Sequence, residues 1–248
     1  MSCERAVKRA EIRQEGDGMS RIKICGLKRM EDIAAVNQYK PDYIGFVFAH
    51  TKRFVSDETA KALKDALAPE ISAVGVFVDE PVGHVVKLVQ EGTIDAIQLH
   101  GQEDIYYVNQ LKEELAKTDR ARIPMIKAVR IDATLEVTGE REQEILQINR
   151  QLIDEARMLQ PDYLLFDARV KGIPGGSGKR FDIAGLPPDE DIGIPYFLAG
   201  GIGLSNVSEL IRLRNPYGID VSSAVETNGC KDREKIKEMI DTVRKESK

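Results

Sequence analysis

Short apolar segments alternate with amphipathic helical segments along most of this chain. Eight segments show the alternating pattern or the short apolar run that is typical of a β-strand. They cover residues 21–25, 43–48, 73–78, 96–100, 125–130, 163–168, 196–201 and 218–223. Segments with apolar residues at helical spacing lie between them, and a charged helix is predicted over 232–246. Between the sixth and seventh strands, Pro187 and Pro188 leave room for only a short helix.

This regular alternation predicts right-handed crossovers and a parallel sheet. Eight such units in 248 residues match the size of a (β/α)8 barrel, the TIM barrel. The alternative, a doubly wound open sheet, usually carries G-x-G-x-x-G after its first strand, and "CGLKRM" lacks that pattern. We therefore predict an α/β protein with one barrel of eight parallel strands over residues 21–248. Residues 1–20 are predicted to form a mobile extension.

Charge and cysteine content limit the possible partners. The net charge of -5 disfavours nucleic acid, which usually selects a strongly basic face. No apolar run approaches the ~20 residues of a membrane span, and the first residues lack the apolar core of a signal peptide. Cys3, Cys25 and Cys230 have no metal-ligand spacing and cannot all pair, which is typical of a reducing cytoplasm. We expect a cytoplasmic protein with no nucleic-acid, membrane or metal partner.

The first strand, "RIKIC", places a cation and a thiol on the same side. Lys23 and Cys25 alternate with Ile22 and Ile24, so we expect the first two to face the barrel interior and the isoleucines to face the helices. A nearby ammonium favours the thiolate form of a cysteine. A buried lysine itself needs a partner, and Asp220 is predicted to face inward from the neighbouring last strand. The sequence therefore predicts a Lys23–Asp220 ion pair.

The ends of the seventh and eighth strands carry small residues. "LAGGI" contains Gly200 and Gly201, and "DVSSAVE" contains Ser222 and Ser223. Barrel enzymes often bind phosphate in these two loops through backbone N–H groups, and small residues let the backbone approach an anion. The alternative is that the glycines only form tight turns. We predict that all four residues bind a phosphate group.

A second glycine-rich segment, "GIPGGSGKR" (172–180), follows the sixth strand. It is one residue too long for a phosphate-binding P-loop, and arginine replaces the Ser or Thr that would contact the metal. We interpret it as an active-site loop in which Gly176 contacts the substrate. A surface loop without a role is the alternative.

Seven motifs follow one another at the spacing of barrel units. They are "KICGL", "GFVF…KRFVS", "VGVFV", "QLHG", "LLFDA…GGSGKRFD", "LAGGI…NV" and "DVSSAVE". Together they resemble the N-(5'-phosphoribosyl)anthranilate isomerase family over about residues 21–244. The resemblance implies an Amadori rearrangement in tryptophan biosynthesis. N-(5'-phosphoribosyl)anthranilate becomes 1-(2-carboxyphenylamino)-1-deoxyribulose 5-phosphate, and neither a cofactor nor a metal is needed.

The resemblance also implies roles for individual residues. Cys25 matches the general base of the family, and Asp167, at the end of the sixth strand, matches its general acid. Arg53 matches the arginine expected at the anthranilate carboxylate. His100 ends the fourth strand, where it can contact the substrate or serve a structural role. The family is more often monomeric, so we expect a monomer rather than a dimer, with a small-molecule substrate as its partner.

Two other functions stay open at this point. The related sugar-phosphate isomerase of histidine biosynthesis has aspartates at both the first-strand and sixth-strand positions, and Cys25 argues against it. A phosphate-binding barrel without catalysis would share the same fold, because fold alone does not determine function. The presence of both Cys25 and Asp167 argues against this second alternative.

Overall fold

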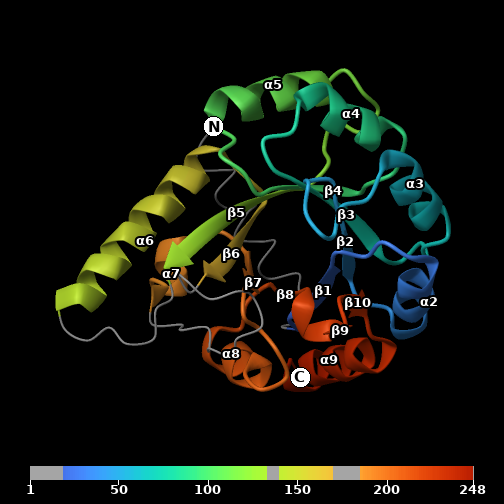
Figure 1. Cartoon of the computed structure of the whole chain (residues 1–248). Coiled ribbons are helices and arrows are strands. Elements are labelled where there is room, and N and C mark those ends of the chain that lie inside the picture. Colours follow the sequence, from blue (N-terminus) through green and yellow to red (C-terminus); the bar gives the residue numbers. More distant parts are fainter. Residues whose placement is uncertain (1–18, 133–139, 170–184, 248) are drawn as a thin grey trace.

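Eight parallel strands form a closed barrel in sequence order, with β1 paired to β8 (Figure 1). This computed structural model describes residues 19–132, 140–169 and 185–247. The strands are β1 (Arg21–Cys25), β2 (Tyr43–Val47), β3 (Ser72–Phe77), β4 (Ala96–Leu99), β5 (Met125–Asp132), β6 (Tyr163–Arg169), β7 (Tyr196–Ala199) and β8 (Gly218–Val221). The predicted single (β/α)8 barrel of the α/β class is confirmed.

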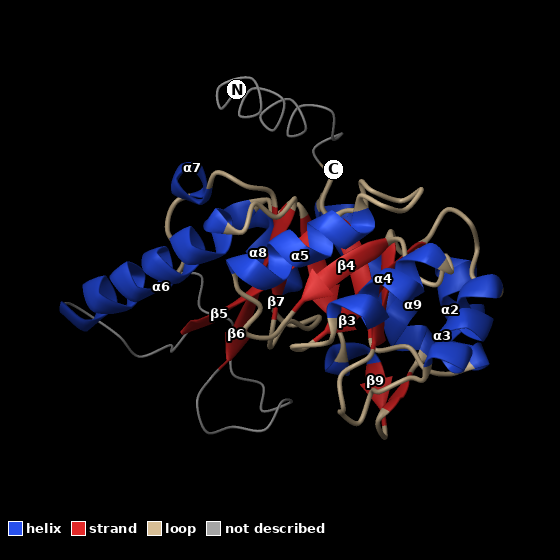
Figure 2. Ribbon diagram, turned by 90° about the horizontal axis from the view of Figure 1, so that it is seen from above, coloured by secondary structure: helices blue, strands red, loops and turns tan. Residues whose placement is uncertain are grey.

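Helices connect successive strands and surround the barrel (Figure 2). They are α2 (Met30–Tyr39), α3 (Asp57–Asp65), α4 (Val82–Gln90), α5 (Ile105–Leu115), α6 (Glu140–Met158), α7 (Asp189–Ile192), α8 (Val207–Arg214) and α9 (Arg233–Glu246). As the two prolines predict, α7 is only one turn long. Among the described residues, no helix is both long enough and apolar enough to cross a membrane.

A short 3-10 helix and a small hairpin follow β8, and the sequence analysis did not predict either. The 3-10 helix, η2, covers Ser223–Val225, and the hairpin pairs β9 (Glu226–Thr227) with β10 (Cys230–Lys231). Asn228 and Gly229 form its turn, with φ values of 52° and 77°. An Asn-Gly pair is the usual signal for a two-residue hairpin turn. The strands here are too short for the alternation that makes longer strands visible in a sequence.

Strand residues alternate between two apolar layers. Ile22 and Ile24 are fully buried in the layer between strands and helices. A second cluster fills the barrel interior, and it includes Val74, Leu165 and Phe197. The predicted outward direction of the two isoleucines is therefore confirmed.

Three tyrosines fill the interior where the strands begin. Tyr43 opens β2, Tyr163 opens β6, and Tyr217 immediately precedes β8. The hydroxyl oxygens of Tyr43 and Tyr217 lie 2.8 Å apart, and the rings of Tyr163 and Tyr217 are 4.5 Å apart between centroids. These side chains pack this end of the barrel.

An ion pair joins the first and last strands inside the barrel. Lys23 and Asp220 are register partners in β1 and β8, and Nζ of Lys23 lies 3.1 Å from Oδ1 of Asp220. The Lys23 side chain has no exposed surface. Burial opposes its charge, but the Asp220 carboxylate keeps the pKa of Lys23 above its ordinary value. The predicted Lys23–Asp220 pair is confirmed.

The chain is held against the barrel just before β1. Ser20 is buried, and its hydroxyl donates a hydrogen bond of 2.9 Å to the carbonyl of Pro216. This bond fixes the chain just before β1. The rest of the predicted extension, residues 1–18, lies outside the described residues.

His84 links the start of α3 to the loop before α4. Its Nε2 lies 2.8 Å from Oδ1 of Asp57, and its Nδ1 lies 2.7 Å from Oε1 of Glu80. Burial would lower the pKa of His84, but the two carboxylates raise it above its ordinary value of 6.5. A protonated imidazole therefore stabilises this contact.

Replacing Lys23 by methionine should destabilise the fold by about 3–5 kcal/mol, because it leaves the Asp220 carboxylate buried without its cation. The double variant Lys23→Met/Asp220→Leu should recover most of that loss, since no buried charge remains. Urea unfolding of the two variants and the wild type measures both effects. If Lys23→Met is as stable as the double variant, the Asp220 carboxylate does not need its cation and the prediction is wrong.

The contribution of His84 to stability should depend on pH. Because its pKa is raised in the folded state, the stabilisation is fully present below about pH 6.5 and is lost as pH rises through the folded-state pKa. His84→Gln should therefore cost more free energy of unfolding at about pH 5.5 than at about pH 9. His50→Gln, at an exposed histidine, is the control. An equal loss at both pH values would show that the charge of His84 does not matter.

Candidate active site

Polar side chains gather where the parallel strands end. Cys25 is the last residue of β1, and Ser222 directly follows β8. Asp167 in β6 pairs in register with Ala199, the last residue of β7. His100 directly follows β4. Because all eight strands are parallel, these ends share one rim, which is where (β/α)8 enzymes carry their active sites.

Cys25 lies in a crowded, mostly buried environment. A Cβ atom added to Gly45 would lie 2.8 Å from Sγ of Cys25 and 3.3 Å from Nζ of Lys23. The missing side chain on β2 therefore makes room for the thiol and the ammonium together. The predicted inward direction of Lys23 and Cys25 agrees with this contact.

The charge state of Cys25 results from opposing effects. Burial raises the pKa of the Cys25 thiol, the ammonium groups of Lys23 and Lys231 lower it, and the Asp220 carboxylate raises it. The net direction is upward. Lys23 does favour the thiolate, as the sequence analysis expected, but burial outweighs its effect and Asp220 partly cancels it.

His100 holds Asp167 in place. Its Nε2 lies 3.3 Å from Oδ2 of Asp167, and its Nδ1 lies 3.0 Å from the amide nitrogen of Gln98. With the Gln98 amide donating to Nδ1, the imidazole proton is on Nε2 and points to the Asp167 carboxyl group. The sequence left open whether His100 contacts the substrate or has a structural role, and in the structure His100 contacts Asp167. Gln98 was not predicted, although the strand alternation puts it on the same face as His100.

Arg53 lies over the end of β1. Its Cδ would be 2.4 Å from a Cβ atom on Gly26, which has a φ of +84°, so only glycine fits at that position. Nε and Nη2 of Arg53 lie 2.8 and 3.2 Å from the two carboxylate oxygens of Glu226. Glu226 was not singled out from the sequence, because its position next to Arg53 depends on the hairpin.

The small residues after β7 and β8 have different structural roles. A Cβ atom on Gly200 would lie 2.4 Å from the carbonyl oxygen of Ala168 and 2.7 Å from Oδ1 of Asp167. Gly200, with a φ of +80°, thus permits the close approach of β7 to β6. Gly201 is exposed and also has a positive φ of 64°.

The two serines at the end of β8 also differ. The hydroxyl of Ser222 donates to the carbonyl of Cys25 over 2.9 Å, which ties β8 to β1. Ser223 is exposed at the first position of η2. Gly176 and the rest of its loop lie outside the described residues.

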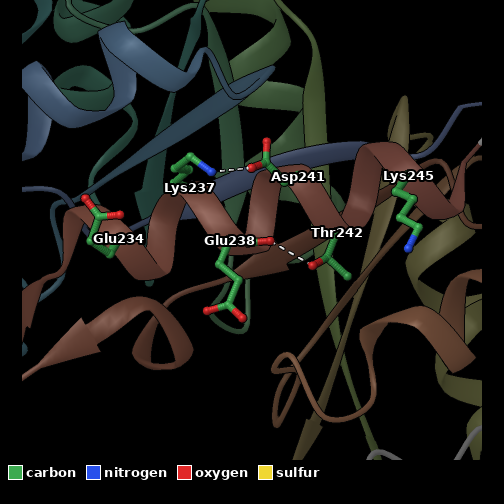
Figure 3. A pocket seen from close by; sticks show the side chains of 6 residues that line it. All are labelled: Glu234, Lys237, Glu238, Asp241, Thr242 and Lys245. Atoms are coloured by element: carbon green, nitrogen blue, oxygen red, sulfur yellow. Dashed lines mark hydrogen bonds and ion pairs between the residues drawn. The ribbon is translucent and has the colours of Figure 1, made fainter.

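Two hollows in the surface lie elsewhere. One, of about 370 Å³, runs along the outer face of α9 and is lined by charged and polar side chains, including the Lys237–Asp241 ion pair (Figure 3). The other, of about 620 Å³, lies beside the first residues of β4 and β5 and includes Ile97 and Met125. Neither is lined by Cys25, His100, Asp167 or Ser222, the residues at the rim where the strands end. Within the three described ranges, no group of three His, Cys, Asp or Glu side chains is arranged to hold a metal ion.

Comparisons with known proteins give a consistent result. Residues 22–242 match the family model described as N-(5'-phosphoribosyl)anthranilate (PRA) isomerase. A protein of that name from Acetivibrio thermocellus is 42% identical over 227 residues, which cover 91% of this chain and 96% of the relative. One from Endomicrobium trichonymphae is 40% identical, covering 91% of this chain and 99% of the relative.

Solved structures agree with the sequence matches. The phosphoribosylanthranilate isomerase of Thermotoga maritima superposes with a TM-score of 0.73 at 30% identity, covering 92% of this chain and all of that one. A second isomerase structure, solved with reduced 1-(o-carboxyphenylamino)-1-deoxyribulose 5-phosphate, has a TM-score of 0.66 at 28% identity and the same coverage. This chain belongs to the N-(5'-phosphoribosyl)anthranilate isomerase family.

Proposed function

We propose that this chain converts N-(5'-phosphoribosyl)anthranilate to 1-(2-carboxyphenylamino)-1-deoxyribulose 5-phosphate, with Cys25 as general base and Asp167 as general acid. Its family is one of isomerases in tryptophan biosynthesis. The observation that carries the residue assignment is the position of Cys25 and Asp167 on β1 and β6, at the same rim of the barrel. A ribose bound between these strands would have an acid on one side and a base on the other.

The acid acts first. Asp167 donates a proton to the ring oxygen of the ribose, the bond from that oxygen to C1' breaks, and a protonated Schiff base forms with the anthranilate nitrogen. Asp167 is then a carboxylate. The Nε2–H of His100, 3.3 Å from Oδ2, stabilises that negative charge and fixes the orientation of the carboxyl group.

The base acts on the open-chain intermediate. The Cys25 thiolate removes the proton from C2', and the electrons of that C–H bond form a C1'–C2' double bond while the Schiff base becomes an amine. The resulting enol takes up a proton at C1' and loses the proton of its C2' hydroxyl, which gives the ketone of the product. Burial raises the pKa of Cys25, so its thiolate is scarcer than that of a free cysteine but is a stronger base. Lys23 and Lys231 oppose that effect.

The other groups of the substrate have separate binding sites in this proposal. The planar fork of Arg53 suits the anthranilate carboxylate, and the guanidinium lies over the strand end that carries Cys25. The phosphate binds at the loops after β7 and β8, through the backbone at Gly201 and Ser223. Ala224, in η2, does not have a positive φ, so its side chain does not strain that turn.

In this proposal Gly176 contacts the substrate from the glycine-rich loop after β6, which is also one of the segments that carry the family resemblance. Gly200 and Ser222 support the phosphate loops indirectly, through their contacts with β6 and β1. The histidine-pathway isomerase and the non-catalytic barrel are less well supported, because the matched family is neither of these.

Cys25→Ser and Asp167→Asn should each fold and bind the product analogue, yet lose most turnover. A serine hydroxyl is far too weak a base for C2', and an amide cannot protonate the ring oxygen. Each loss should be about 10²–10⁴ in kcat or larger, and the two should not add, because both groups serve one reaction path. Steady-state kinetics with phosphoribosylanthranilate generated in the assay measures turnover. Calorimetry with the reduced product measures binding. Near-normal turnover in Cys25→Ser would show that the base lies elsewhere.

A further inference from the structure

The Glu226 carboxylate is shared by two cations at the rim. It accepts hydrogen bonds from Nε and Nη2 of Arg53 over 2.8 and 3.2 Å, and Nζ of Lys231 lies 2.9 Å from its Oε1. The side chains of Glu226 and Lys231 are only 8% and 2% exposed, whereas that of Arg53 is 24% exposed. The arginine is therefore the member of this group that a ligand can reach.

The hairpin that carries Glu226 is held firmly against the barrel. Nη2 of Arg29 donates to the carbonyl of Lys231 over 3.1 Å, and Nζ of Lys235 donates to the carbonyl of Glu226 over 2.8 Å. Nζ of Lys231 also lies 2.9 Å from the carbonyl of Ser222, at the end of β8. Glu226 is thus a fixed acceptor rather than a mobile surface side chain.

The geometry of the Arg53–Glu226 pair leaves part of the guanidinium available. A guanidinium has five N–H donors in one plane, and Glu226 accepts from the edge formed by Nε and Nη2. The other edge, which contains Nη1, can bind a second carboxylate at the same time. Because Gly26 has no side chain, the stem of Arg53 can lie against the backbone next to Cys25.

We propose that Glu226 is a positioning residue for the isomerase reaction: it holds one edge of Arg53 so that the other edge meets the carboxylate of the substrate. Lys231 holds Glu226 and compensates its charge, so that the three residues together keep a net charge of about +1 at neutral pH. This inference rests on the proposed role of Arg53 at the anthranilate carboxylate.

The ionisation of Glu226 is consistent with this role. Burial alone would raise its pKa, but the hydrogen bonds from Arg53 and Lys231 lower the pKa of Glu226 to about 2. The carboxylate is therefore charged at any pH at which the enzyme would work. Glu226 therefore keeps its edge of Arg53 when a substrate carboxylate binds. The substrate carboxylate binds at the second edge of the guanidinium.

The test uses two ligands and three variants of the full chain. The ligands are reduced 1-(o-carboxyphenylamino)-1-deoxyribulose 5-phosphate and the same compound without its ring carboxylate. The variants are Glu226→Gln, which has nearly the same shape as the wild type, Arg53→Lys, and the control Glu238→Gln, which changes an exposed carboxylate on α9. Calorimetry measures the dissociation constants, and steady-state kinetics measures kcat and KM separately.

Glu226→Gln should weaken binding of the carboxylate ligand about tenfold or more, the effect of losing one charged hydrogen bond. Binding of the ligand without the carboxylate should change by less than about twofold, as should both ligands with Glu238→Gln. KM should rise more than kcat falls, because the contact is made in the ground state and the transition state alike. This dependence on the ligand carboxylate would not appear if Glu226 only stabilised the hairpin.

Three results would overturn the inference. An equal loss for both ligands would assign Glu226 a structural role, and tighter binding of the carboxylate ligand would make Glu226 a competitor of the substrate. If Glu226→Gln has no effect while Arg53→Lys still weakens binding of the carboxylate ligand only, the inference on Glu226 is wrong but the proposed role of Arg53 stands. If Arg53→Lys also fails to distinguish the ligands, the proposed role of Arg53 is wrong as well.

Discussion

The ion pair between Lys23 and Asp220 lies at the centre of both the fold and the site. Lys23 and Asp220 are register partners on the first and last strands, so their ion pair helps to close the barrel. The same pair lies inside the barrel, near the end where the polar side chains gather. The same ammonium acts on the thiol of Cys25 two residues further along β1. Because the lysine is fully buried, its charge is tolerable only while the aspartate remains. The environment of the Cys25 thiol therefore depends on the contact that closes the barrel.

The proposed acid, Asp167, and the proposed base, Cys25, are supported in different ways. Asp167 is held by the His100 side chain, which Gln98 contacts in turn. The missing side chain at Gly200 leaves room for the Asp167 carboxyl group. Cys25 is surrounded by charges of both signs, two ammonium groups and a carboxylate, in a partly buried position. The first arrangement fixes the orientation of a carboxyl group. The second sets the proton affinity of a thiol, which is the property that a general base requires.

Much of this arrangement was predictable because it follows from strand alternation. Period-two spacing placed Lys23, Cys25 and Asp220 on the inner face, and closure of the barrel made β1 and β8 neighbours. The residues that were missed depend on contacts between distant segments. Glu226 reaches Arg53 only through a hairpin of two-residue strands, and Gln98 has a role only because His100 and Asp167 meet across the rim. A local pattern can indicate the hairpin turn or the strand face, but it does not give the partner on a distant segment.

At Cys25 burial outweighs the two nearby ammonium groups, so that the proposed base is a thiol with a raised pKa. The direct measurement is the rate of iodoacetamide alkylation of Cys25 against pH, in a Cys3→Ser/Cys230→Ser background without ligand. Since only the thiolate reacts, the rate should rise with pH and reach half its maximum above about pH 8.5, the value of an unperturbed cysteine. A midpoint clearly below that value would contradict the account, because it would mean that the cations control the thiol.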